Sequence, residues 1–193
     1  MTTGKRRLTP LDRPWRVFLS HTSDLREHPA PRSFVAAAEA AIMRAGHAVS
    51  DMVYFAARDA TCPDLCARML QRCDVYLGIV GVRYGTAALG RPDRSYVELE
   101  FEIATAIGIP RLIFLVSADA PALPPAVQSP GQDARQAAFR DRLLACDLTA
   151  ARVRWPAELE LEVLHALGEL RAESACARRS RGGCPAGAYR LRC

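Results

Sequence analysis

Three glutamates alternate along the segment SYVELEFE, and they are the residues of this chain best suited to acid–base or nucleophilic chemistry. Ser95 opens the segment and predicts a helix N-cap, with Glu98 at the spacing of a capping box. On such a helix Glu98 and Glu102 share one face, whereas Glu100 lies on the opposite, apolar face. A carboxylate on an apolar face needs either a structural partner or a chemical task.

Cleavage of an N-glycosidic bond is the chemistry that one such carboxylate can support. The reaction passes through a cationic, oxocarbenium-like sugar, which a carboxylate stabilises or attacks. Glu100 is the candidate catalytic residue for this step. The alternative is a structural Glu100 that pairs with Arg83 or with a backbone amide.

Further candidate substrate-binding residues follow the first and third predicted strands. Ser20, His21 and Asp24 follow the first strand and offer contacts to ribose or phosphate oxygens, with capping and loop hydrogen bonds as the alternative. Arg83 and Tyr84 follow the third strand. Arginine pairs well with a diphosphate and tyrosine stacks on a base, against a structural salt bridge or packing.

The elements that position these residues alternate between strand and helix along the chain. Strands are predicted at 16–20, 49–55, 75–82, 111–117 and within 148–155, and helices at 34–46, 63–73, 95–107, 133–146 and 157–172. This alternation predicts a flavodoxin-like α/β fold, a parallel five-stranded sheet of order 2-1-3-4-5 with helices on both faces. Ligands bind at the carboxyl ends of strands in such sheets, so the candidate residues are expected at one edge.

Charge and motifs argue against several function classes. From residue 171 onward the chain has six Arg and one Glu, so the net charge of +5 belongs to this tail, and nucleic-acid binding by a folded face is not expected. No GxGxxG follows the first strand and no GxxxxGK[ST] occurs, which argues against a Rossmann dinucleotide site and a P-loop. The seven Cys form no CxxC pair, so we expect buried thiols and no metal site.

Four stretches of the chain carry a family resemblance: VFLSHTSDLRE, VYFAARDATCPDLC, CDVYLGIVGVRYG and RSYVELEFEIATAIGIPRLIFL. Together they resemble a bacterial domain of unknown function that is TIR-like (Toll/interleukin-1 receptor) and commonly heads STAND-type NTPases. The resemblance covers roughly residues 15–170. In enzymatic TIR domains, which cleave NAD, the glutamate follows a Ser-aromatic-x-x-x-Glu pattern, and Ser95, Tyr96 and Glu100 fit it. Glu100 also precedes Gly108 and Pro110, as the nucleophile does in the related nucleoside deoxyribosyltransferases.

The resemblance implies a substrate pocket and a function. It places Asp24 in the pocket loop, implies substrate contacts near Ser95 and Tyr96, and puts Arg58 and Asp59 in a loop that covers substrate or joins neighbouring domains. The expected function is a TIR-like signalling domain of a bacterial defence or signalling pathway that cleaves NAD or a related nucleotide. The alternative is a non-catalytic protein–protein interaction module that self-associates or recruits partners.

The expected organisation is a disordered leader at 1–14, a TIR-like domain at 15–172 and a basic disordered tail or linker at 173–193. NAD enters as a substrate, and no cofactor is expected. A homo-oligomer or a partner signalling domain is the expected assembly. The chain lacks a secretory h-region and any apolar run of about 20 residues, so a cytoplasmic protein without a membrane span is predicted.

Overall fold

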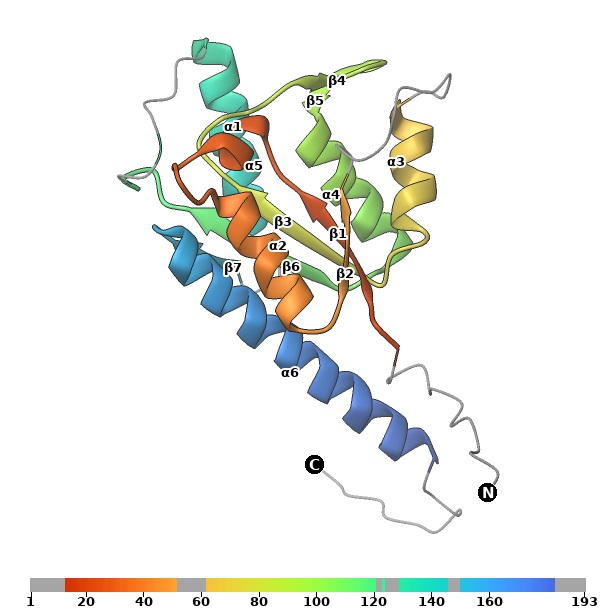
Figure 1. Ribbon diagram of the computed structural model, residues 1–193. Coiled ribbons are helices and arrows are strands. Elements are labelled where there is room, and N and C mark those ends of the chain that lie inside the picture. Colours follow the sequence, from red (N-terminus) through yellow and green to blue (C-terminus); the bar gives the residue numbers. More distant parts are fainter. Residues whose placement is uncertain (1–12, 52–61, 121–122, 124–128, 146–149, 183–193) are drawn as a thin grey trace, which may run out of the picture.

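A five-stranded parallel sheet forms the centre of the computed structural model, which describes residues 13–51, 62–120, 123, 129–145 and 150–182 (Figure 1). Its strands are β1 (Arg16–Ser20), β2 (Ala48–Asp51), β3 (Val75–Val80), β6 (Arg111–Val116) and β7 (Ala150–Val153). They lie in the order β2-β1-β3-β6-β7, and each neighbouring pair is parallel. The predicted flavodoxin-like order 2-1-3-4-5 is therefore confirmed.

Helices cover both faces of the sheet. They are α1 (Ser23–Glu27), α2 (Phe34–Arg44), α3 (Cys62–Leu70), α4 (Tyr96–Ile107), α5 (Pro130–Ala145) and α6 (Pro156–Gly182). Helices α2 and α6 pack side by side on one face, and α3, α4 and α5 pack on the other (Figure 1). Among the described residues, none of these helices is both long enough and apolar enough to cross a bilayer.

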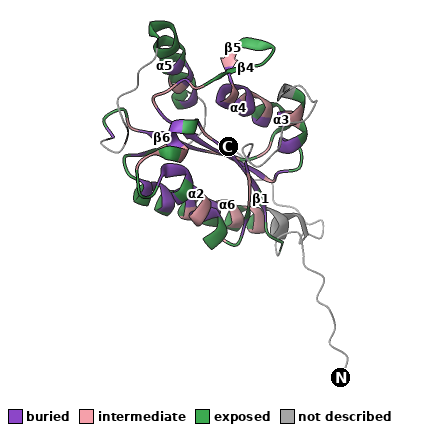
Figure 2. Ribbon diagram, turned by 45° about the horizontal axis from the view of Figure 1, so that its top comes forward, coloured by how far each residue is buried: buried purple, intermediate pink, exposed green. Residues whose placement is uncertain are grey.

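Successive strand residues point to opposite faces of the sheet and pack into two separate hydrophobic layers. In β3, Leu77 and Ile79 pack under α2 and α6, whereas Tyr76 and Val80 pack under α3, α4 and α5. All six residues of β3 are buried, as expected for a central parallel strand. The buried colour is prominent along the strands at the centre of the domain in Figure 2. The sheet thereby separates the layer that carries α4 from the layer that carries α6.

Local sequence signals fix the helix ends. The side chain of Ser33 accepts a hydrogen bond from the backbone N–H of Ala36, and the side chain of Ser95 accepts one from Glu98. Such caps contribute about 1 kcal/mol each. Gly108 ends α4 in the left-handed conformation (φ 73°), which glycine adopts without steric cost. The predicted Ser95 cap and the predicted end of this helix at residue 107 are confirmed.

Three local features differ from the predictions. A small antiparallel hairpin, β4 (Ala87–Ala88) with β5 (Arg91–Ser95), stands where a loop was predicted, because Gly90 supplies a turn with positive φ. A short helix, α1, replaces part of the predicted polar loop after β1. The predicted second strand, 49–55, begins at Ala48 and is strand through Asp51, and its remaining residues lie outside the described part of the chain.

The boundaries of the domain also shift. Helix α6 continues to Gly182, although disorder was predicted from residue 173. The prediction failed because it required an apolar period, and a helix that extends past the sheet has no core to face. Most of the predicted leader and residues 183–193 lie outside the described residues, but Arg13 bonds Asp74, with Nη1 2.9 Å from Oδ2.

Candidate active site

The carboxyl edge of the sheet brings Ser20 and Glu100 together across 80 positions of sequence. Ser20 is the last residue of β1, and Glu100 lies in the second turn of α4, which packs over that strand end. The Ser20 hydroxyl donates a hydrogen bond to Glu100 Oε2 at 2.5 Å. Both residues are buried, with 1% and 5% of their surface exposed. The site therefore holds a carboxylate that has been taken out of water and given one strong donor.

Burial controls the protonation of this carboxyl. It raises the pKa of Glu100 from 4.5 to about 7, since the charged form is poorly solvated there. The hydrogen bond from Ser20 and the charge of His21 oppose the rise, and the negative charge of Asp51 adds to it. Glu100 is thus poised to gain or lose a proton near neutral pH, as a general acid or base requires.

The predicted division of the α4 glutamates is confirmed. Glu98 and Glu102 meet the same arginines: Arg142 bonds Glu98, and Arg94 Nε lies 2.9 Å from Glu102 Oε1. Glu100 has neither partner. Arg83, its predicted structural partner, lies instead near Asp24, with Nε 4.0 Å from Oδ2. Within the described residues Glu100 forms no ion pair, so the predicted structural pairing of Glu100 with Arg83 is wrong.

A buried charged cluster lies beside Glu100. His21 Nε2 lies 2.9 Å from Asp51 Oδ2, and His21 Nδ1 lies 2.9 Å from the Thr22 carbonyl. Both ring nitrogens thus lie within hydrogen-bond distance of an oxygen, and Arg26 Nη2 lies 3.4 Å from Nε2. Arg26 also bonds Asp51, and its Nη2 lies 3.1 Å from Glu39 Oε1. His21 therefore meets its prediction of lying at this edge, and its ring is held by structural partners.

The aromatic ring of Tyr76 lies at the floor of the site. Its ring is fully buried, and its hydroxyl has no hydrogen-bond partner of good geometry among the described residues. Burial and the charge of Glu100 raise the pKa of Tyr76. The ring lies over Gly78, where an added Cβ would stand 2.9 Å from the ring edge and 3.1 Å from the hydroxyl. Gly78 therefore makes room for a phenol beneath the carboxylate.

Two polar atoms in the turn after β1 are buried without partners. Asp24 Oδ1 and Thr22 Oγ1 make no hydrogen bond within the described residues. Asp24 is 7% exposed and Thr22 8% exposed, and the side chain of Arg83 above Asp24 is 37% exposed. Unsatisfied buried polar atoms are costly, so this turn is a candidate for ligand contact.

The remaining predicted site residues have structural contacts. Tyr84 is 2% exposed and donates to Glu98 Oε2 at 3.1 Å, which leaves its ring no open face for stacking on a base. Ser95 caps α4, and the Tyr96 hydroxyl accepts a hydrogen bond from the backbone N–H of Leu89 at 3.1 Å. Arg58 and Asp59 lie outside the described residues.

Sequence reasoning missed Asp51, Arg26 and Tyr76. Asp51 ends β2, so the rule that selected the residues after β1 and β3 applies to it equally. Tyr76 gave no signal, because a tyrosine in an apolar strand is indistinguishable from a core aromatic. Among the residues that the structure describes, no three His, Cys, Asp or Glu side chains are grouped as a metal site requires.

Comparison with protein families matches residues 16–168 to a domain of unknown function, DUF4062. That range runs from the first residue of β1 into α6 and includes every strand of the sheet. This chain belongs to the DUF4062 family. The match confirms the part of the sequence-based resemblance that concerns a domain of unknown function.

Comparisons with curated proteins and with solved structures give less information than the family match. No curated protein matches this DUF4062 domain. Among solved structures it is similar to the TIR domains in the structure of the activated Roq1 resistosome directly recognizing the pathogen effector XopQ. That likeness has 14% identity and a TM-score of 0.43, and it covers 82% of this chain and 84% of the other. The fold of the DUF4062 domain therefore rests on its own strand order.

Proposed function

We propose that this DUF4062 domain hydrolyses the N-glycosidic bond of NAD or a related nucleotide, with Glu100 as the catalytic carboxylate. The observation that carries the proposal is the isolation of Glu100: it is buried at the ligand-binding edge of the sheet, with a pKa of about 7 and a single hydroxyl donor among the described residues. A buried carboxyl costs stability unless it is paired, so a buried Glu100 without an ion pair among the described residues supports a chemical role.

The reaction needs little more than this carboxylate and a bound sugar. The bond between C1′ and the base nitrogen breaks, the base leaves with the electron pair, and Glu100 stabilises the cationic sugar or bonds to C1′. Water then attacks C1′, and where Glu100 has bonded to C1′ that bond breaks and its electron pair returns to the carboxylate. The proton that the water gives up passes to the free Glu100 carboxylate. Ser20 holds the carboxylate in place through its 2.5 Å hydrogen bond.

The neighbouring turn supplies the binding groups in this proposal. Asp24 Oδ1 and Thr22 Oγ1, which have no partner among the residues that the structure describes, suit ribose hydroxyls, and Arg83 offers a guanidinium for a phosphate. Glu100 is 5% exposed, so substrate reaches it only after a movement of the surrounding segments. We therefore infer that activity depends on assembly, with a second copy or a partner domain in a STAND-type signalling or defence protein of the cytoplasm.

Nicotinamide release from NAD tests the proposal. We expect release by the wild-type protein at high concentration with a crowding agent, and a loss of at least about 10³-fold in Glu100→Gln. Glu102→Gln is the matched control, since it removes a glutamate from the same helix on the exposed face. Equal activity of wild type and Glu100→Gln would exclude Glu100 from catalysis, and silence of both would favour the second candidate function.

That second candidate is a non-catalytic interaction module. The observation that favours it is a pair of large apolar side chains on the surface: Leu89 at the hairpin turn and Leu161 on α6, each 70% exposed. Light scattering against protein concentration tests it. A module would show a mass that rises with concentration in wild type and in Glu100→Gln, and that falls toward the monomer in Leu89→Ser or Leu161→Ser.

A further inference from the structure

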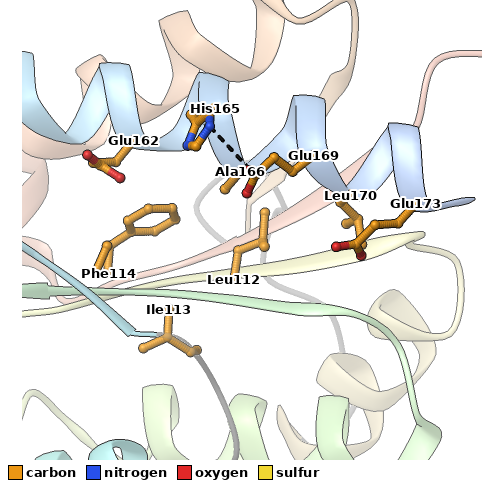
Figure 3. Close-up of a pocket in the computed structure, with 10 residues that line it drawn as sticks. Leu112, Ile113, Phe114, Glu162, His165, Ala166, Glu169, Leu170 and Glu173 are labelled. Carbon is orange, nitrogen blue, oxygen red and sulfur yellow. Dashed lines mark ion pairs between the residues drawn. The ribbon is translucent and has the colours of Figure 1, made fainter.

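A groove on the α6 side of the sheet is separate from the candidate active site. It has a volume of about 310 Å³ and runs between α6 and the strands β6 and β7 (Figure 3). Its walls are apolar close to the sheet, with Leu112 and Phe114 directed toward α6, and Ala166 and Leu170 directed toward the strands. Leu112 and Leu170 are only half-buried, so apolar surface remains open to an occupant.

The rim of this groove is acidic. Glu162, Glu169 and Glu173 follow one another along α6 above the apolar floor (Figure 3). Glu169 lies 3.3 Å from His165, and both side chains are largely exposed. Glu162 and Glu173 form no ion pair within the described residues, although the chain has 26 Lys and Arg. An apolar floor under unpaired carboxylates suits a short segment that carries both cations and apolar side chains.

We propose that this groove binds the chain's own N-terminal segment, residues 1–12. The segment reads MTTGKRRLTPLD. Its cations, Lys5, Arg6 and Arg7, form one run that complements the acidic rim, and two apolar side chains, Leu8 and Leu11, follow this run. In the proposed contact the leucines cover the floor, and the three cations meet the glutamates of α6.

The point at which the segment leaves the domain supports this assignment. Arg13, the next residue, bonds Asp74, which directly precedes β3. Strand β3 is the neighbour of β6, and Leu77 of β3 pairs with Leu112 in the groove floor. The segment leads into β1, which lies two strands from β6, so it leaves the domain roughly 10 Å from the strand that floors the groove.

Length and geometry allow the contact. Twelve extended residues reach up to about 40 Å, whereas α6 rises only about 16 Å between Glu162 and Glu173. The other basic segment, residues 183–193, holds Arg190 and Arg192 but has to reverse direction at the end of α6 before it can reach the groove. The N-terminal segment is the better occupant by charge and by starting point.

Peptide binding to full-length protein tests the proposal. The probe is a fluorescein-labelled peptide of residues 1–12. The receptor is the full chain with Lys5, Arg6, Arg7 and Leu8 changed to Ser. Fluorescence anisotropy measures the binding of the peptide to this receptor. We expect saturable binding to this receptor and at least ten-fold weaker binding to the wild-type chain, whose own segment competes at high effective concentration. Circular dichroism checks that each variant is folded.

Two matched variants locate the binding site. Adding Glu169→Gln and Glu173→Gln to the receptor should weaken binding at least ten-fold, and adding Glu102→Gln on the other face of the sheet should leave it unchanged. The proposal is overturned if the receptor shows no saturable binding, if wild type binds the peptide equally well, or if the groove substitutions have no effect. Tighter binding of a peptide of residues 183–193 would assign the groove to the C-terminal segment instead.

Discussion

Two glutamates on one helix, Glu98 and Glu100, are equally buried and have opposite surroundings. They are 6% and 5% exposed. Glu98 is bonded by Arg142 and Tyr84 and lies 3.6 Å from Arg94, whereas Glu100 has the hydroxyl of Ser20. Burial is therefore common to both, and the partners make the difference. A buried carboxylate with two arginines is a structural group, and one without an arginine partner among the described residues carries the proposed chemistry.

The largest expected change in stability comes from breaking the Glu98 cluster. Glu98→Ala should lower the free energy of unfolding by about 3 kcal/mol, because it removes the carboxylate that Arg142 and Tyr84 share. This figure is at the low end for buried pairs, since the Arg142 side chain is 47% exposed. Urea unfolding measures it. A loss below 1 kcal/mol would remove the distinction between a structural Glu98 and an unpaired Glu100.

Glu100→Gln should act in the opposite direction at alkaline pH. The folded-state pKa of Glu100, about 7, lies above its ordinary value of 4.5, so its ionisation costs stability as pH rises from 4.5 through 7. The loss in the free energy of unfolding reaches about 3 kcal/mol. The Gln side chain of Glu100→Gln does not ionise, so the variant should be more stable than wild type by about 2 kcal/mol at pH 8.

The measurement is urea unfolding of wild type and Glu100→Gln between pH 5 and pH 8. We expect the two stability curves to be close at pH 5 and to separate as pH rises, with Gln the more stable. Parallel curves would show that Glu100 keeps its ordinary pKa. Glu102→Gln serves as the control for removal of one negative charge from the same helix.

Ser20→Ala should sharpen the contrast by removing the donor of Glu100. The hydrogen bond stabilises the charged carboxylate, so the pKa of Glu100 should rise further and stability at pH 8 should fall by about 1.5 kcal/mol. At pH 5 the carboxyl is protonated, and the loss should be smaller. A loss that is independent of pH would mean that Ser20 matters for packing alone.

Tyr76→Phe has the smallest expected effect. It deletes a fully buried hydroxyl that has no hydrogen-bond partner of good geometry among the described residues, although Ser20 lies close enough to influence its pKa. Stability at pH 8 should therefore stay within about 1 kcal/mol of wild type or rise slightly. Thermal unfolding measures the change. A loss above 1 kcal/mol would show that the phenol donates to the Glu100 carboxylate in solution, and Glu100 would then share more of the character of Glu98.

Much of the fold could be predicted because its signals are local. The strand at Val75–Val80 is a continuous apolar run, Ser95 and Gly108 mark the ends of α4, and the alternation of strands and helices leaves few topologies. The hairpin β4–β5 could not be predicted, since strands of two and five residues have no apolar period of their own. The continuation of α6 to Gly182 was missed for the same reason.

The sequence by itself determined that Glu100 lies on the apolar side of a capped helix, because helical periodicity places it there whatever the rest of the chain does. It also determined that the residues after β1 and β3 meet at one edge, because parallel strands end together. Only the tertiary structure decided which partners these groups find. The bond between Ser20 and Glu100 and the pair of His21 with Asp51 each join residues that are distant in sequence. Such pairs depend on how helices and strands pack in three dimensions, which no local pattern records.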